Sequence, residues 1–371
     1  MMEILYFGGF ELPDKNAAAH RALNNAKALR GKGYKVILCG VSKEPQASTL
    51  ERENIQGFEA YHIQYPRTAG EWLKRLTNIS YLQTILKEHP DVRLIIAYNA
   101  YSFMLSRLNC AAHAQGIKVI ADCTEWYEDR FSLKPREFIQ FINSNYLMKH
   151  VNRRLDGLFV TSTFLASYYK GMQILRLPPL VDTSEDIWTA EVDEPREEPT
   201  KIIYTGIPGP DKDKLKTIIH AIAVSSRRDL EFEVVGMTQE EYLEQNPKGL
   251  EDIKVLHKRI SFSGRLPHDE TIKKLRCSDV AIIIRDKTRK NQAGFPTKFV
   301  EAYTAGIQII ANDFSDVKDY ASDRVRIIQT EALGTCVESG LRHLETKKIH
   351  LEFDYQQWED RIDAFISQIM D

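Results

Sequence analysis

Short apolar runs alternate along the chain with longer segments in which apolar positions recur every three or four residues. In the first half, the short runs span residues 3–7, 34–39, 94–97, 118–121 and 157–161. The longer segments span residues 16–30, 72–87, 102–115, 135–155 and 163–170. The short runs predict strands and the periodic segments predict helices. Strands that alternate with crossover helices indicate a parallel sheet covered by helices on both faces.

The pattern fails in residues 177–200, where proline and acidic residues replace the hydrophobic period. We therefore predict a linker at residues 183–200 between a first domain, residues 1–182, and a second domain, residues 201–353. In the second domain the predicted strands and helices span residues 201–205, 214–225, 230–235, 260–262, 269–277, 280–284, 296–305 and 308–311. The fold class is then α/β, with two doubly wound, Rossmann-like domains facing a central cleft at the carboxyl ends of their strands.

The last segment, residues 354–371, has apolar residues at positions that form one stripe on a helix. We interpret it as a helix that caps the second domain.

Composition narrows the function. The 371 residues carry 50 Lys and Arg against 52 Asp and Glu, a net charge of −2, so a nucleic-acid partner is not expected. The five cysteines are scattered without C-x-x-C spacing, which argues against a zinc site and a disulfide framework and favours a reducing cytoplasm. The N-terminus does not resemble a signal peptide, and no stretch reaches the roughly 18 apolar residues of a membrane span. Membrane contact is therefore expected to be peripheral only.

A phosphate site is predicted where the second domain begins a helix after the polar run of residues 286–294. Pro296 suits the first helical position, and the helix N-terminus attracts anions. Thr297 and Lys298 add a hydroxyl and an ammonium group. One turn later, Glu301 can accept hydrogen bonds from two vicinal ribose hydroxyls. The alternative for Lys298 and Glu301 is an ordinary solvated helix face.

Residues 293–301 (Ala-Gly-Phe-Pro-Thr-Lys-Phe-Val-Glu), together with 305–306, 204–209, 263–268 and 122–127, resemble glycosyltransferase family 4, especially its bacterial capsule and exopolysaccharide members. The resemblance implies a GT-B enzyme that transfers a sugar from a nucleoside diphosphate, UDP favoured and GDP possible, to a glycan or lipid-linked acceptor. It also implies retention at the anomeric carbon, with the leaving phosphate helping to deprotonate the acceptor.

By this resemblance Glu301 holds the donor ribose, while Ala293 stands where the family has another glutamate and Ile207 where we look for an arginine. Lys212, with Lys214 as second choice, is the candidate for the diphosphate lysine. Arg285, at the end of a strand, is the candidate to replace the missing arginine or else a surface ion pair. The full set of donor candidates is Gly209, Arg265, Arg285, Gly294, Phe295, Pro296, Thr297, Lys298 and Glu301.

The run Asp211-Lys212-Asp213 has D-x-D form, but it opens a predicted helix, where acids favour the dipole. Lysines and helix ends can stabilise a leaving diphosphate without a metal, so we expect no metal ion and no other cofactor.

In the first domain, Gly8 and Gly9 follow the first strand and permit either close approach of a ligand or a tight turn. Asn16 is expected to cap the next helix, and His20 to face the cleft or to pack. Asp122 and Glu125 lie in a loop after a strand. We interpret them as catalytic or acceptor-binding carboxylates, against a simpler role in capping the loop.

The segment 130–154 is amphipathic and basic. It either rests on an anionic membrane and presents a lipid-linked acceptor, or is a crossover helix packed on the sheet. Two other functions are kept open: a nucleotide-sugar epimerase, which would need several acids and histidines in the cleft, and a non-catalytic partner of another glycosyltransferase.

Overall fold

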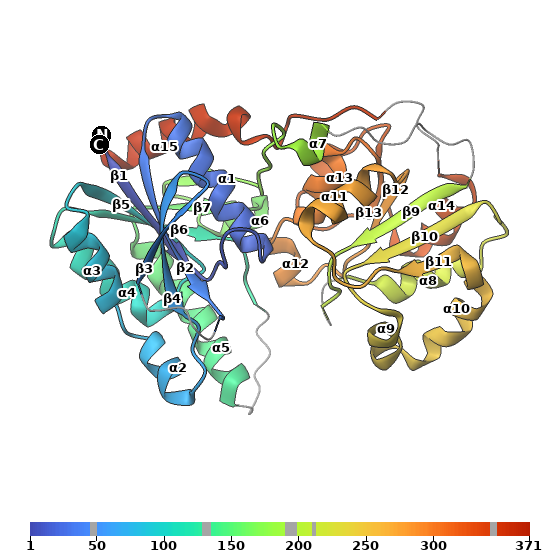
Figure 1. Cartoon of the computed structure of the whole chain (residues 1–371), viewed down its shortest axis with the longest axis horizontal. Coiled ribbons are helices and arrows are strands. Elements are labelled where there is room, and N and C mark those ends of the chain that lie inside the picture. Colours follow the sequence, from blue (N-terminus) through green and yellow to red (C-terminus); the bar gives the residue numbers. More distant parts are fainter. Residues whose placement is uncertain (45–49, 128–134, 190–198, 210–212, 342–346) are drawn as a thin grey trace. The chain divides into compact units, whose positions relative to one another are not determined.

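The computed structural model describes residues 1–44, 50–127, 135–189, 199–209, 213–341 and 347–371. The chain forms two compact units (Figure 1). Unit 1 comprises Met1–Val181 and Tyr355–Asp371, and unit 2 comprises Asp182–Asp354.

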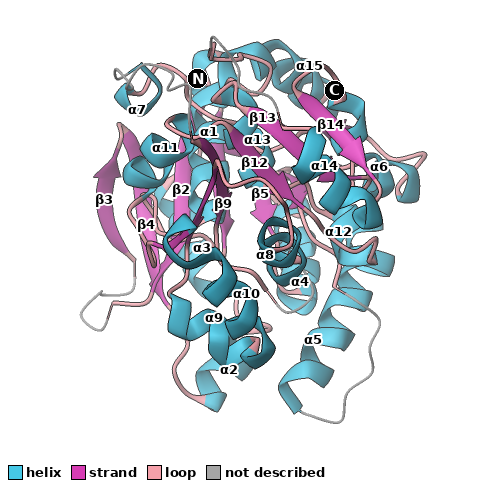
Figure 2. Cartoon of the chain, turned by 90° about the vertical axis from the view of Figure 1, so that its right-hand side faces the viewer, coloured by secondary structure: helices cyan, strands magenta, loops and turns pink. Residues whose placement is uncertain are grey.

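Unit 1 is built on an eight-stranded sheet with the order β3-β4-β2-β1-β5-β6-β7-β8, in which β3 alone runs antiparallel to its neighbour. The strands are β1 (Glu3–Gly8), β2 (Lys35–Ser42), β3 (Glu51–Ile55), β4 (Phe58–Gln64), β5 (Val92–Tyr98), β6 (Lys118–Cys123), β7 (Gly157–Val160) and β8 (Ile174–Arg176). The predicted parallel sheet is confirmed. The edge hairpin β3–β4 was not predicted (Figure 2).

The helices of unit 1 connect these strands as predicted, with two differences. They are α1 (Ala17–Gly31), α2 (Ala69–Arg75), α3 (Ser80–Glu88), α4 (Ser102–His113), α5 (Pro135–Tyr146), α6 (Thr163–Tyr168) and α15 (Glu359–Met370). The segment 72–87, predicted as one helix, is divided between α2 and α3. The predicted helix 135–155 is α5 followed by a π-helical turn, Leu147–Val151, and a 3-10 turn, Asn152–Arg154.

The C-terminal helix α15 belongs to unit 1, so our interpretation of it as a cap of the second domain was wrong. Its apolar stripe, which includes Ile362, Phe365 and Ile366, lies in the core that β1 and α1 share. Phe365 packs on Phe159 of β7, with ring centroids 5.3 Å apart. The stripe itself was predicted correctly, but a stripe does not specify which sheet it covers.

Unit 2 is built on a parallel six-stranded sheet with the order β11-β10-β9-β12-β13-β14. The strands are β9 (Thr200–Thr205), β10 (Leu230–Val235), β11 (Ile260–Phe262), β12 (Val280–Ile283), β13 (Gln308–Asn312) and β14 (Val325–Ile328). The helices are α7 (Asp186–Thr189), α8 (Leu215–Ala223), α9 (Gln239–Gln245), α10 (Leu250–Leu256), α11 (His268–Arg276), α12 (Arg289–Ala293), α13 (Thr297–Thr304) and α14 (Leu333–Ser339).

Part of the predicted linker is folded onto unit 2. Trp188 of α7 is buried, and the Arg276 guanidinium donates to the Ile187 carbonyl at 3.0 Å. The acidic run 190–198 lies outside the described residues. Among the described residues, no helix is long and apolar enough to cross a membrane.

Candidate functional site

Three glycines follow three adjacent strands at the carboxyl edge of the unit 2 sheet. Gly206, Gly236 and Gly264 have φ angles of +96°, +121° and +64°, which a residue with a side chain adopts only under strain. A Cβ atom on Gly236 would lie 2.5 Å from the backbone of Gly206. The Gly236 N–H donates to the Gly264 carbonyl at 2.7 Å. The loops after β9, β10 and β11 are therefore packed backbone against backbone.

Beside Gly206, one carboxylate holds two cations. The Asp213 carboxylate accepts hydrogen bonds from Arg285 Nε at 2.7 Å and from Lys298 Nζ at 2.9 Å. It also accepts one from the Tyr204 hydroxyl at 2.9 Å. The side chains of Asp213, Arg285 and Lys298 are only 2%, 10% and 12% exposed. The structure thus brings together two of the predicted donor-site cations around an aspartate that was not predicted to contact them.

Burial shifts the protonation equilibria of this cluster. Burial by itself would raise the pKa of Asp213, but Lys298 and Arg285 lower it well below its ordinary value, so the carboxylate is ionised. Burial lowers the pKa of Lys298, with Arg285 adding to this and Asp213 opposing it. Burial, followed by the Asp213 charge, raises the pKa of Tyr204 well above its ordinary value. Two cations therefore share one anion in a largely buried site. The low effective dielectric there strengthens the attraction of the cations for a further anion.

Backbone contacts hold Arg285 in place, and an aromatic ring supports Lys298. Asp213 and Arg285 form an antiparallel bridge, and the Lys214 N–H donates to the Ile284 carbonyl at 2.9 Å. The Asn312 side chain of β13 accepts from the Arg285 N–H at 2.9 Å and donates to its carbonyl at 2.7 Å. The Lys298 ammonium lies 4.0 Å from the centre of the Tyr204 ring, a favourable cation–π distance.

Helix α13 begins beside this cluster. It starts at Thr297, one residue later than predicted, with Pro296 at the N-cap and no side-chain cap. Thr297 is half-buried. One turn on, Glu301 is largely buried, and its carboxylate lies 3.1 Å from His268 Nε2 at the start of α11. Glu301 is thus held by an imidazole from the first residue of α11.

The Phe295 side chain packs in the core, and its predicted contact with the donor stays a prediction. Its ring is 7% exposed and packs in an aromatic cluster with Phe299, Tyr320 and Phe353. An apolar ring is more stable in this core than beside a charged diphosphate. Gly294 precedes it as the C-cap of α12, and Ala293 is fully buried.

Of three other residues predicted at the donor site, the structure describes Arg265 and Gly209 but not Lys212. The Arg265 side chain is 72% exposed, with Glu241 at 4.0 Å. Gly209 is half-buried at the end of the described segment after β9. Lys212 lies outside the described residues.

In unit 1, Asp122 was wrongly interpreted as a carboxylate available for chemistry. It is fully buried and accepts hydrogen bonds from Arg21 Nε and Nη2, at 2.8 Å and 2.7 Å, and from the Tyr6 hydroxyl at 2.5 Å. Arg21 also donates to the carbonyls of Leu177 and Pro178, both at 3.1 Å. This network ties β6 and residues 177–178 to α1. Arg21 was missed, although an arginine on an alanine-rich helix face was a usable signal.

Glu125 keeps its candidate role. It is half-buried in the loop after β6 and accepts a hydrogen bond from the Tyr127 hydroxyl at 2.6 Å. The neighbouring Trp126 is buried and packs on Phe164 and Tyr168.

The remaining predicted residues of unit 1 lie near the start of α1. A Cβ atom on Gly8 would lie 2.5 Å from the Tyr98 carbonyl oxygen, so Gly8 is required for strand packing, whereas Gly9 faces open space. Asn16 caps α1 as predicted, accepting from the Ala19 N–H at 2.8 Å. His20 is half-buried one turn into α1.

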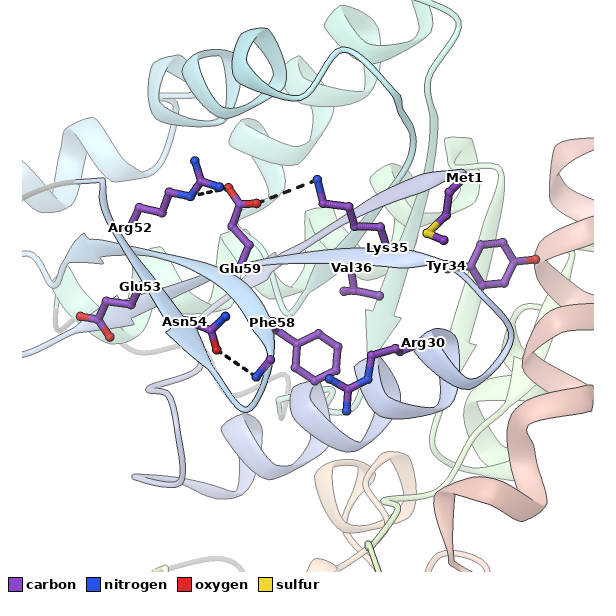
Figure 3. Close-up of a pocket in the computed structure, with 11 residues that line it drawn as sticks. Met1, Arg30, Tyr34, Lys35, Val36, Arg52, Glu53, Asn54, Phe58 and Glu59 are labelled. Carbon is purple, nitrogen blue, oxygen red and sulfur yellow. Dashed lines mark hydrogen bonds and ion pairs between the residues drawn. The ribbon is translucent and has the colours of Figure 1, made fainter.

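A separate pocket of about 610 Å³ lies where β1, β2 and β4 begin (Figure 3). Its residues include Arg52, whose Nε lies 2.8 Å from Glu59, and Phe58, whose ring is covered by Arg30. Ligands of doubly wound folds bind at the carboxyl ends of the strands. We therefore do not assign this pocket to the site predicted above.

Comparison with known proteins agrees with the geometry. Residues 18–185 match the family model of Glycosyltransferase Family 4, and residues 199–339 match that of Glycosyl transferases group 1. No curated protein matches the chain in sequence.

Solved structures of GT-B glycosyltransferases share the fold. The sucrose-phosphate synthase of Thermosynechococcus elongatus is 14% identical, with a TM-score of 0.73 over 100% of this chain and 99% of that one. A trehalose-6-phosphate synthase is 11% identical, with a TM-score of 0.71 over 99% and 98% of the two chains. Anabaena HepE, solved with UDP and glucose, is 13% identical, with a TM-score of 0.66 over 99% and 100%.

Proposed function

Because the chain belongs to the GT-B glycosyltransferases, with family 4 and group 1 models matching its two halves, we propose that it transfers a sugar from a nucleoside diphosphate with retention of anomeric configuration. UDP is the favoured nucleotide and GDP the alternative. The acceptor is a glycan or a lipid-linked glycan of a cell-surface polysaccharide such as a capsule or exopolysaccharide. One observation carries the proposal: Arg285 and Lys298 are held together beside Gly206, at the carboxyl edge of a parallel sheet.

This arrangement suits a departing nucleoside diphosphate. Two cations and the start of a helix stabilise developing negative charge without any rearrangement during the reaction. Arg285 would replace the arginine that is expected at position 207, where this chain has Ile207. Lys212 would add a third cation. We propose that these groups make a metal ion unnecessary.

Glu301 would bind the ribose hydroxyls, with His268 orienting its carboxylate from 3.1 Å away. HepE was solved with UDP and glucose, and the trehalose enzyme of E. coli with UDP-2-fluoro glucose, which supports a UDP-sugar as the first donor to test. On the acceptor side, Glu125 is the proposed contact, because Asp122 is buried under Arg21.

The test is release of nucleoside diphosphate from a panel of UDP- and GDP-sugars, with and without acceptor. Lys298→Met should lower kcat by about two orders of magnitude, since it removes one stabilising charge from the leaving group. Lys287→Met is the matched control, because Lys287 is 57% exposed and pairs with Asp313. Turnover of Lys298→Met at the wild-type rate would refute the assignment. Donor isomerisation without release would indicate an epimerase, and no reaction with any donor would indicate a non-catalytic partner.

We also propose that unit 1 contacts an anionic membrane through α5 and the basic turns after it. Phe138, Ile139 and Ile142 of α5 are 38%, 46% and 39% exposed, and Lys149 and Arg154 lie exposed further along the chain. Apolar and basic groups together favour binding to anionic lipid. Residues 130 and 134, which contributed to this prediction, lie outside the described residues. Co-sedimentation with vesicles containing phosphatidylserine, compared with phosphatidylcholine alone, tests this, and absence of binding removes the membrane role.

A further inference from the structure

The cluster at the carboxyl edge of the unit 2 sheet contains one more charged group than diphosphate binding needs. Arg285 and Lys298 contribute two positive charges and Asp213 one negative charge, so the three side chains have a net charge of +1. An aspartate that faces the same donors as the ligand opposes anion binding. We propose that Asp213 is a built-in competitor of the nucleoside diphosphate, a positioning residue that keeps both cations in place and limits how tightly they hold the product. This inference rests on the proposed function.

The hydrogen bonds show why the carboxylate and a diphosphate compete. Asp213 Oδ1 accepts from Arg285 Nε, and Asp213 Oδ2 accepts from Lys298 Nζ and from the Tyr204 hydroxyl. A phosphate oxygen is an acceptor of the same charge sign and geometry. Each hydrogen bond that a diphosphate forms with these two cations therefore weakens or replaces one that they form with Asp213.

The surroundings keep Asp213 charged and fixed. Its side chain is 2% exposed, and its ionised form is stabilised by both cations. The bridge between Asp213 and Arg285 and the Lys214 to Ile284 hydrogen bond hold the backbone of this segment against β12. The backbone of Asp213 is consequently held beside Arg285, so the carboxylate stays within reach of both cations.

The consequence for turnover follows from charge. Without Asp213 the two cations would bind a nucleoside diphosphate more tightly, and product release limits kcat in many enzymes. A nearby anion lowers the affinity for the charged product, while the cations remain oriented for the transition state. Removal of the Asp213 charge therefore distinguishes the two roles. Loss of a competitor raises the affinity for nucleoside diphosphate, whereas loss of a supporting residue lowers it.

The experiment is calorimetric titration of wild type and Asp213→Asn with UDP and with GDP at low and high salt. Removing one negative charge beside the cations should tighten binding of whichever nucleotide the wild type prefers by about tenfold or more at low salt, and by less at high salt. In turnover assays kcat should fall and product inhibition should strengthen. Asp313→Asn is the matched control, because Asp313 pairs with the half-exposed Lys287, and it should bind as the wild type does.

The outcomes separate the two proposals. If wild type binds neither nucleotide, the proposed function fails and the inference falls with it. The inference is wrong if wild type binds a nucleotide and a folded Asp213→Asn binds it more weakly than wild type, or as tightly as wild type at both salt concentrations. Asp213 then only supports the site. If Asp213→Asn does not fold, Tyr204→Phe decides, because it removes a donor to Asp213 and leaves the carboxylate to compete harder. That variant should bind the nucleotide a few-fold more weakly, and unchanged or tighter binding would overturn the inference.

Discussion

The buried ion pair of unit 1 allows a quantitative test of the role assigned to Asp122. In Arg21→Met, the carboxylate of Asp122 loses the Nε and Nη2 donors, while the Tyr6 hydroxyl remains. Asp122 is 0% exposed, so water cannot replace those donors. An uncompensated charge then stays in the core.

The expected effect is large. Removing one partner of a buried ion pair costs about 3–5 kcal/mol, because the other charge is left without compensation. A unit of this size loses about 2–4 °C in Tm for each kcal/mol. We therefore expect the Tm of unit 1 to fall by roughly 10 °C in Arg21→Met. The double variant Arg21→Met/Asp122→Asn should regain part of this loss, because no charge then remains buried.

Differential scanning calorimetry of the three proteins measures this directly. Lys32→Met is the control, since Lys32 pairs with Asp360 at the surface, and it should melt close to wild type. Equal Tm values for Arg21→Met and wild type would refute the reasoning. So would a double variant that is less stable than the single one.

Two further predictions concern a glycine and a tyrosine. Gly206→Ala places a Cβ atom at φ +96°, 3.3 Å from the Lys298 ammonium, so we expect a loss of about 1–3 kcal/mol in stability and weaker nucleotide binding. A variant that melts at the wild-type temperature, both without UDP and with it, would contradict this. Burial and the hydrogen bond to Asp363 raise the pKa of Tyr34 to about 12, whereas in the unfolded chain it is near 10. The unfolded chain therefore loses this proton at lower pH than the folded chain does, and the free energy of unfolding falls as the pH rises from 10 to 12. In Tyr34→Phe the free energy of unfolding, measured by urea titration, should differ less between pH 8 and pH 11 than it does in wild type.

Most of the fold could be predicted because its strands are continuous apolar runs. The predicted strand 201–205 is β9, Thr200–Thr205, and the predicted helix 296–305 is α13, Thr297–Thr304. The hairpin β3–β4 was missed since four of the five residues of β3 are exposed and polar, which leaves no alternation to detect. The position of α15 was also not predictable, because it depends on which of two sheets has an uncovered apolar face.

The site was predicted in parts rather than as a cluster. Lys298 and Arg285 were found from local patterns, a helix start and a strand end. Asp213 was considered only as part of a D-x-D run, which we discounted as a metal site. Its contacts with Arg285 and Lys298 could not be predicted, because these partners are 72 and 85 residues away in sequence. Asp122 shows the same limit, since its burial depends on Arg21, 101 residues earlier.

Because α15 packs in unit 1, unit 2 is an insertion within the sequence of unit 1. Unit 2 is one uninterrupted piece of chain, whereas unit 1 requires both ends of the sequence. During synthesis, unit 2 can therefore complete its core first, while α1 keeps an apolar face uncovered until α15 has been synthesised. For the same reason, unit 2 is joined to unit 1 by two chain connections, at 181/182 and 354/355, and a chain that stops short of α15 lacks part of the core of unit 1.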